Sequence, residues 1–257
     1  MTPADRGEQS RTEAFEKRWR ARFEDFAGRS DDDAGIAGWS ESGLQARLRN
    51  FARAWRPGRA GSSWLDVGCG AGSYARFIAG HGMQVCGFDY SLPTIVKARA
   101  RSTPGIVWAV ADATRLPVKE QAFDGVVCFG VTQALGGSAT AVEQLCRAVR
   151  IDGEIWVDAL NRWCLPNLIE AWMRRLRGRP QHLRYESPRA LRRLLGANGV
   201  VDLRLHWVPI MPARWQRFQW LMETPFTRWA LRVIPALGML VSHAFVLAGR
   251  RRPGLQR

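Results

Sequence analysis

The part of this chain that most constrains its fold is residues 64–74, which read Trp-Leu-Asp-Val-Gly-Cys-Gly-Ala-Gly-Ser-Tyr. The apolar beginning of this stretch predicts a buried strand that ends at Val67, and its end begins a helix predicted over residues 73–79. Three alternating glycines separate the two elements: Gly68, Gly70 and Gly72. Because glycine has no Cβ, the backbone can turn sharply here and a ligand can lie directly against it. The free N–H groups at the start of the following helix add hydrogen-bond donors to the same turn.

The spacing of these glycines is G-x-G-x-G, with Asp66 two residues before the first, and differs from the G-x-G-x-x-G of dinucleotide sites. A glycine-rich turn alone fits either a nucleotide site or a plain strand-to-helix turn. The full sequence Leu-Asp-Val-Gly-Cys-Gly-Ala-Gly is more specific, because it resembles the first motif of class I S-adenosylmethionine (SAM)-dependent methyltransferases. In that family the glycine turn packs against the methionine part of SAM, and the acidic residue at the position of Asp66 helps to hold the amino group. The resemblance therefore implies five cofactor contacts: Asp66, Gly68, Cys69, Gly70 and Gly72.

Strands and helices alternate after this turn, and the strands are almost entirely apolar. The predicted strands cover residues 63–67, 84–88, 106–110, 125–129, 154–159 and 200–207. This rhythm is typical of a parallel sheet with helices on both faces, in which ligands bind outside the carboxyl ends of the strands. Residues 243–250 resemble the closing strand of the same family, inserted antiparallel beside the sixth. We therefore expect an α/β fold with a doubly wound, seven-stranded, mostly parallel sheet of the Rossmann-like methyltransferase type.

Three regions are expected in this fold. Residues 1–60 form an N-terminal helical cap, and residues 61–161 form the SAM-binding core. Residues 162–257 form a helical insert on the substrate side, followed by the last strands of the same domain. Within the cap, apolar spacing predicts helices over residues 12–26 and 42–55, and the second is expected to cover the open end of the sheet.

The two cap helices are separated by residues that break a helix. Three aspartates at residues 31–33 and a glycine, Gly35, interrupt the first helix. The sequence Gly38-Trp39-Ser40 follows and is a candidate lid segment. Trp39 fits equally well as a packed structural residue and as a substrate contact.

Acidic residues follow the second and third predicted strands. Asp89 and Tyr90 stand at the end of the second strand, where a carboxylate can accept both ribose hydroxyls and an aromatic ring can lie against adenine. The alternative is that Asp89 caps the next helix, although Ser91 can do the same. After the third strand, Asp112 can take the adenine amino group, with the backbone N–H of Ala113 facing the ring. The pattern Asp-Ala-x-x-Leu-Pro, with Phe-Asp a short loop later, again resembles the SAM-dependent family.

Residues after the fourth and fifth strands bear on the methyl acceptor. Phe129 begins a segment that in the family lines the SAM cavity and faces the substrate. Many relatives carry a histidine where this chain has Ala134, so the resemblance supplies no general base. His182 is the histidine best placed to act as one, but a lone histidine in a loop is more often a surface residue, and no catalytic residue is assigned. Asn161 is expected at the mouth of the site or as a helix cap.

Positive charge is concentrated in the last third of the chain. Residues 1–161 contain 20 basic and 19 acidic residues, whereas residues 162–257 contain 18 arginines and 4 acidic residues. Such a region can attract nucleic acid, an anionic membrane surface or an acidic substrate, or it can consist of solvated arginines. Residues 213–240 are also rich in aromatic residues, and predict helices that pack as core, build an apolar substrate pocket or lie on a membrane surface. The apolar run 233–248 is shorter than the ~20 residues of a membrane span.

The remaining composition bears on the cellular setting. Five cysteines occur without a C-x-x-C pair, and the four histidines form no zinc-like cluster, so no metal site is expected. The polar, charged beginning of the chain does not read as a signal peptide. We therefore expect a reducing, cytoplasmic setting, with peripheral membrane contact through the Arg- and Trp-rich last third.

The preferred hypothesis is a SAM-dependent methyltransferase of a small molecule, lipid-like or saccharide-linked, with S-adenosyl-L-homocysteine as product. SAM carries an already activated methyl group, so in-line placement of the acceptor and exclusion of water would be the main catalytic effects. One alternative is an RNA methyltransferase that uses the basic last third, although no Asn-Pro-Pro-Tyr-like motif follows the fourth strand. Another is a non-catalytic scaffold, against which the intact glycine turn, Asp89 and Asp112 argue. The sequence predicts no oligomeric state.

Overall fold

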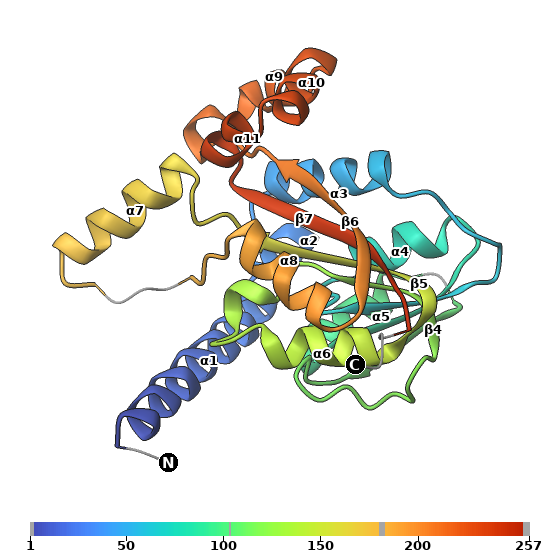
Figure 1. The fold of residues 1–257 in the computed structure, drawn as a ribbon. Coiled ribbons are helices and arrows are strands. Elements are labelled where there is room, and N and C mark those ends of the chain that lie inside the picture. The colour runs from blue at the N-terminus through green and yellow to red at the C-terminus, as the bar shows by residue number, and fades with distance from the viewer. Residues whose placement is uncertain (1–2, 103, 180–182, 254–257) are drawn as a thin grey trace.

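The computed structural model describes residues 3–102, 104–179 and 183–253. This part of the chain forms a seven-stranded sheet with the order β3-β2-β1-β4-β5-β7-β6 (Figure 1). The strands are β1 (Ser63–Val67), β2 (Gln84–Asp89), β3 (Ile106–Val110), β4 (Phe123–Cys128), β5 (Val149–Leu160), β6 (Val200–Val208) and β7 (Ala244–Arg251). Neighbouring strands pair in parallel except at β7, which lies antiparallel between β5 and β6. The predicted fold class, including the antiparallel closing strand, is confirmed.

Alternate residues of the central strands enter two separate apolar cores, one on each face of the sheet. In β1, Trp64 belongs to one core, whereas Leu65 and Val67 belong to the other. The helices that pack on the sheet are α3 (Glu41–Ala54), α4 (Ser73–Ala79), α5 (Leu92–Ala100), α6 (Ala139–Ala148) and α8 (Pro188–Ala197). Residues of α3 and α4 join the core of Trp64, and residues of α6 and α8 join the other. Because both faces are buried, the strands are apolar along almost their whole length.

Strand β5 begins earlier than predicted. Val149 pairs with Phe123 of β4, and pairing resumes between Glu154 and Gly125 after an irregularity in the register. Between them Asp152 has φ 63°, the left-handed region that allows the chain to turn. The turn expected before the strand therefore lies inside it.

The N-terminal cap consists of α1 (Pro3–Arg29), the short helix α2 (Asp33–Ile36) and α3. The predicted interruption after α1 is confirmed, but Asp33 already begins a turn of helix. Asp32 caps this turn, because its Oδ1 accepts a hydrogen bond from the Gly35 N–H at 2.7 Å. Figure 1 shows the beginning of α1 extending away from the sheet and its end lying beside it.

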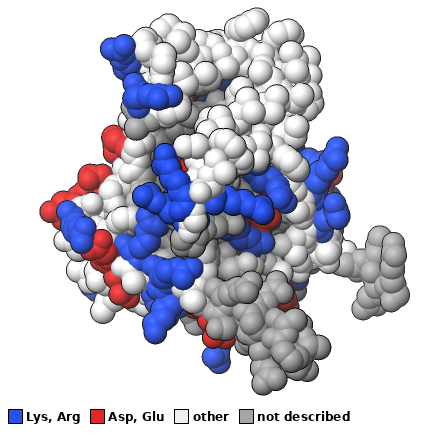
Figure 2. Space-filling view, turned by 90° about the vertical axis from the view of Figure 1, so that its left-hand side faces the viewer, with Lys and Arg blue, Asp and Glu red and all other residues white. Residues whose placement is uncertain are grey.

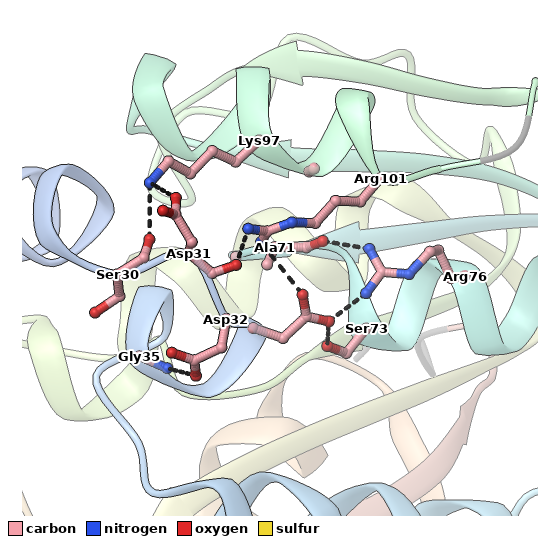
Figure 3. Close-up of polar contacts among 12 residues, drawn as sticks. Ser30, Asp31, Asp32, Gly35, Ala71, Ser73, Arg76, Lys97 and Arg101 are labelled. Carbon is pink, nitrogen blue, oxygen red and sulfur yellow. Dashed lines mark hydrogen bonds and ion pairs between the residues drawn. The ribbon is translucent and has the colours of Figure 1, made fainter.

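Ion pairs join the α1–α2 segment to the helices of the core (Figure 3). Lys97 Nζ, on α5, lies 2.9 Å from Asp31 Oδ1. Asp33 pairs with Arg76 of α4, and Ser73 Oγ donates to the same carboxylate at 2.5 Å. Since α4 follows the glycine turn directly, these contacts hold α2 beside that turn.

Four helices lie apart from the sheet: α7 (Leu165–Leu176), α9 (Gln219–Met222), α10 (Pro225–Val233) and α11 (Pro235–Val241). Helix α7 follows β5, and α9–α11 lie between β6 and β7; in Figure 1 both groups stand away from the sheet. The apolar run 233–248 begins at the last residue of α10 and is otherwise divided between α11 and β7. Across the described ranges, no helix combines the length and apolar character that crossing a membrane requires.

Candidate functional site

A cavity lies at the carboxyl ends of β1, β2 and β4, over the glycine turn. Residues of α1, α2 and the segment leading into α3 complete its wall. Eight of the ten residues predicted to contact the cofactor line this cavity: Gly68, Cys69, Gly70, Asp89, Tyr90, Asp112, Ala113 and Phe129. The other two, Asp66 and Gly72, do not line it. The fold therefore brings residues from four successive strand ends to one place.

The three glycines of the turn have different reasons to be glycine. All adopt left-handed φ values, of +71° at Gly68, +52° at Gly70 and +87° at Gly72. A Cβ on Gly68 would lie 2.1 Å from Val131 Cγ2, and one on Gly72 would lie 2.4 Å from the Trp108 ring. A Cβ on Gly70 would meet only Ala37, at 3.9 Å. Gly68 and Gly72 are thus required by packing, whereas Gly70 presents bare backbone to the cavity.

Asp89 is held in place by backbone donors on both sides. Its Oδ2 accepts from Gly70 N at 3.1 Å, and its Oδ1 accepts from Ser91 N at 3.0 Å. Burial raises the pKa of this carboxyl to about 6, against the lowering effect of these hydrogen bonds. Ser91, not Asp89, caps α5, since its hydroxyl accepts from Thr94 N. The structure therefore leaves Asp89 facing the cavity without the capping role that was its alternative.

Asp66 lies beneath the turn rather than in the cavity wall. Its side chain is buried, and Oδ2 accepts from Ala75 N of α4 at 3.0 Å. Burial raises the pKa of Asp66 to about 7, and the nearby charge of Asp89 adds to the rise. In this structure Asp66 ties the start of α4 to the end of β1.

The wall beyond β3 includes a contact that the sequence analysis missed. Asp112 Oδ1 accepts from Thr114 N at 2.8 Å, while Oδ2 receives Arg20 Nη2, from α1, at 3.1 Å. The Arg20 guanidinium also lies 5.4 Å from the centre of the Tyr90 ring, and Phe23 meets that ring edge-on. The apolar stripe of α1 was the available signal, but its spacing indicates only which face packs.

The segment predicted as a lid contributes Trp39 to the cavity wall, and a buried ion pair supports it. The Arg47 guanidinium lies 4.4 Å from the Trp39 ring centre, and Arg47 Nε lies 3.7 Å from Asp158 Oδ2. Asp158 Oδ1 accepts from Gly130 N at 2.7 Å, and a Cβ on Gly130 would lie 2.6 Å from Trp39. Burial raises the pKa of Asp158 to about 6, opposed by Arg47. Trp39 is thus both a structural residue and part of the cavity.

The wall beyond β4 is apolar, and the described residues that line the cavity include no histidine. Val131, Ala134 and Leu135 form this wall beside Trp39. Asn161, expected at the mouth, is wholly buried elsewhere and donates to the carbonyls of Met239 and Ser242 at 2.7 and 2.8 Å. The expectation for Asn161 is therefore wrong: pairing of β5 with β7 directs its side chain to the α11–β7 connection. His182 lies outside the described residues.

Comparison with known proteins identifies a family by sequence and the same fold among solved structures. Residues 65–157 match the family model described as a methyltransferase domain. Over 171 residues the chain is 30% identical to malonyl-[acyl-carrier protein] O-methyltransferase of Enterobacter lignolyticus, which covers 66% of this chain and 67% of that protein. Over 168 residues it is 25% identical to ubiquinone biosynthesis O-methyltransferase of Pseudomonas paraeruginosa, covering 63% and 66%.

The structural likeness extends further along the chain than the family model. Magnesium protoporphyrin IX methyltransferase of Synechocystis, solved with bound SAH, has a TM-score of 0.58 and 15% identity, with 85% of each chain covered. The matches to malonyl-[acyl-carrier protein] O-methyltransferases span from 45% to 67% of those relatives' own lengths. The family model ends at residue 157, so the helices between β5 and β7 lie outside it.

Proposed function

Because the chain belongs to the class I SAM-dependent methyltransferases, we propose that it transfers a methyl group from SAM to an oxygen atom of a small, lipid-like acceptor. The observation that carries the proposal is the difference between two walls of one cavity. The wall at the end of β2 presents the Asp89 carboxylate, whereas the opposite chemistry comes from Val131 and Leu135 after β4, together with Trp39 from the segment before α3. An acceptor with an apolar body gains most from a wall of this kind. The choice of oxygen rests on the names of the relatives, which are O-methyltransferases.

The residues at the turn fit SAM by their chemistry. The bare backbone of Gly70 leaves room for a ligand against the chain. Asp89 offers an acceptor for ribose hydroxyls, and Tyr90 and Ala113 offer surfaces for adenine. Asp112, whose Oδ2 is bound by Arg20, is a candidate acceptor for the adenine amino group. When bound, SAM supplies a methyl group activated by its sulfonium centre.

The residues around the cavity contribute by positioning the acceptor and by excluding water. Trp39, whose ring lies against the Arg47 guanidinium, lines the cavity, as do the rings of Tyr74 and Phe129, which are tilted by 32° with 4.4 Å between their centres. Such residues orient an acceptor and exclude water, which lowers the entropic part of the barrier. No residue of the described cavity wall is assigned as a general base.

Methyl transfer from tritiated SAM to an extract of cellular small molecules tests this function. We expect label in the lipid-soluble fraction. We expect Trp39→Ala to reduce kcat/KM about tenfold for the acceptor found, because an apolar contact of about 1.5 kcal/mol is lost. Valine at position 96, exposed on α5, provides the control variant Val96→Ala, which should retain the wild-type rate. Label in the water-soluble fraction alone would contradict the lipid-like acceptor.

A lipid-like acceptor also leads us to propose peripheral membrane contact through α7 and α10. Both helices turn their apolar side outward, which is unusual for a surface helix. On α7 the exposed apolar residues recur at helical spacing: Leu165, Leu168, Ile169, Trp172 and Leu176. On α10 the same is true of Phe226, Trp229 and Val233. Phe226 is 73% exposed and Trp172 is 60% exposed, so these are not partly covered core residues.

The charges around these helices favour an anionic surface. Figure 2, viewed from the side of α7, shows an upper end without acidic side chains and a belt of Lys and Arg below it. Arginine and tryptophan beside an apolar stripe suit the boundary between headgroups and acyl chains. The four acidic residues in 162–257, against 18 arginines, leave this region strongly positive.

Sedimentation with phosphatidylcholine vesicles, with and without about 30% phosphatidylglycerol, tests this contact. We expect binding to the anionic vesicles and a loss of about tenfold or more in the double variant Trp172→Ser/Phe226→Ser, because each ring buries apolar area in the interface. Val96→Ser on α5, also at an exposed apolar position, should bind as the wild type. Equal binding of the double variant and the wild type would refute the proposed contact.

A further inference from the structure

An open groove of about 810 Å³ lies between α3, β6 and the α9–α10 pair, apart from the cofactor cavity. The two sites share α3 but not its residues. Leu44, near the start of that helix, lines the cavity, whereas Asn50 and Arg53, near its end, line the groove. Figure 1 shows α3 and the end of β6 side by side below α9 and α10. The proposed methyl transfer does not use this groove, and the proposed vesicle contact shares with it only Trp229 of α10.

The groove is lined by far more positive than negative charge. Its basic residues are Arg53, Arg56, Arg204, Arg228 and Arg232, and its single carboxylate is Glu223. Glu223 already forms ion pairs, since its oxygens lie 2.7 Å from Arg49 and 2.8 Å from Arg53. Burial acts to raise the pKa of Glu223, but these hydrogen bonds hold it at about 2, so the pair stays ionised. Within the described part of the chain, the other four arginines have no carboxylate at ion-pair distance.

The pKa of His206, in β6, reflects the positive charge of the groove. Burial first, and then the charges of Arg204 and Arg232, lower the pKa of this imidazole to about 4. Its Nε2 is buried and has no hydrogen-bond partner among the described residues. The ring stacks on Trp156, 5.6 Å between centres, which fixes its plane. The groove therefore combines two guanidinium groups that have no carboxylate partner with an imidazole nitrogen that no described residue satisfies.

The walls of the groove are fixed by hydrogen bonds between elements. Asn50 Nδ2 of α3 donates to the Trp207 carbonyl of β6 at 3.0 Å. Gln219 of α9 donates to the Pro209 carbonyl at 3.0 Å and accepts from Met211 N at 2.8 Å. A groove held in this way needs little rearrangement on binding, which favours affinity.

We propose that this groove binds a phosphate-bearing anion, with Arg204 and Arg232 as its main contacts. A phosphate group carries about two negative charges and three acceptor oxygens at neutral pH, and guanidinium groups match it in shape and charge. A ligand with only one carboxylate group would leave most of the four unpaired arginines without a partner. The phosphate has two sources in principle, a soluble phosphorylated molecule or a phospholipid headgroup. The exposed apolar residues Trp229 and Val233 of α10 directly follow Arg228 and Arg232 in the sequence, which fits a phospholipid headgroup as the source of the phosphate.

Calorimetric titration with inorganic pyrophosphate tests the site, because pyrophosphate presents the shared chemistry without a lipid. We expect saturable binding by the wild type and a loss of about tenfold or more in Arg204→Gln/Arg232→Gln. These arginines have no acidic partner in the described structure, so the variant should keep the wild-type melting temperature. Arg99→Gln, an exposed arginine on α5 away from the groove, is the matched control and should bind as the wild type. Equal binding by the double variant, or no binding by the folded wild type up to about 10 mM, overturns the proposal.

An NMR titration of the His206 ring gives a second readout that loss of folding cannot imitate. A bound anion offsets the charges of Arg204 and Arg232, so pyrophosphate should raise the pKa of His206 above its value in the free protein. An unchanged His206 pKa at saturating pyrophosphate would place the anion elsewhere and overturn the assignment. Vesicles of phosphatidylcholine with phosphatidic acid identify the source: competition with pyrophosphate supports a headgroup, and its absence supports a soluble phosphate. Both source outcomes support the groove, and neither depends on methyl transfer.

Discussion

Asp89→Asn is expected to lower the affinity for SAM about 100-fold. A hydrogen bond to a charged acceptor contributes about 1.5–3 kcal/mol, and the proposed role of Asp89 includes two of them, to the ribose hydroxyls. Asparagine keeps one acceptor oxygen and the size of the side chain, but its NH₂ group cannot accept. Calorimetric titration of SAM into the wild type and the variant measures the difference.

A control variant separates a local effect of Asp89→Asn from a general one. Asp25→Asn, on the exposed side of α1 where Asp25 pairs with Arg29, should bind SAM like the wild type. Binding of SAM by Asp89→Asn with the wild-type affinity would remove Asp89 from the proposed site. No binding by the well-folded wild type would contradict SAM binding by the free protein and favour the scaffold hypothesis or a site completed by the acceptor.

The proposed role of Asp89 also predicts how the affinity for SAM changes with pH. Burial raises the pKa of this carboxyl to about 6 in the ligand-free protein. Only the ionised form accepts two hydroxyls, so a proton competes with the ligand. Affinity should be nearly constant above about pH 7 and should fall by up to about tenfold per unit as the pH drops below 6. Asp89→Asn should remove this part of the slope.

Arg47→Ala is expected to lower the free energy of unfolding by about 3–5 kcal/mol, because it leaves a buried carboxylate without its counter-charge. Arg47 and Asp158 are 6% and 5% exposed at their side chains, so water cannot replace the lost partner well. The substitution also removes the cation–π contact with Trp39. Urea unfolding monitored by circular dichroism gives the change.

The expected loss has a matched control and a pH signature. Arg49→Ala, two residues along α3, breaks a pair with the exposed Arg49 and leaves Glu223 bound to Arg53, so it should cost about 0–1 kcal/mol. The difference in the free energy of unfolding between the wild type and Arg47→Ala should shrink as the pH falls from 7 towards 5. The pKa of Asp158 is raised to about 6, and protonation of the folded state removes the uncompensated charge. Equal stability of Arg47→Ala and the wild type would show that the pair contributes little.

Local patterns in the chain account for the parts of the site that were predicted. Gly70, Asp89 and Asp112 lie at the end of an apolar strand or in the turn that follows it, and parallel strands end at the same edge of a sheet. Glycine permits the positive φ values found at the turn but does not impose them. The alternation of strands and helices and the resemblance of the closing strand predicted the doubly wound sheet, whereas the strand order comes from the structure.

Long-range contacts account for the parts that were missed. Arg20 reaches Asp112 across 92 residues of sequence, and Arg47 reaches Asp158 across more than 100. Helical spacing in α1 and α3 indicates an apolar face but not which side chain meets which strand end. Asn161 was misplaced because its direction depends on the pairing of β5 with β7, which no neighbouring residue specifies.

The amino-acid sequence by itself determined the family, the sheet and the strand-end residues of the cofactor cavity, because backbone conformation and hydrophobic periodicity are local properties. Only the tertiary structure decided what covers that cavity, which arginines find carboxylates and which remain unpaired in the groove, and that α7 and α10 turn apolar sides outward. These features depend on the distances between side chains from separate elements. Charge pairing and burial are set by such distances, and no spacing along the chain contains them.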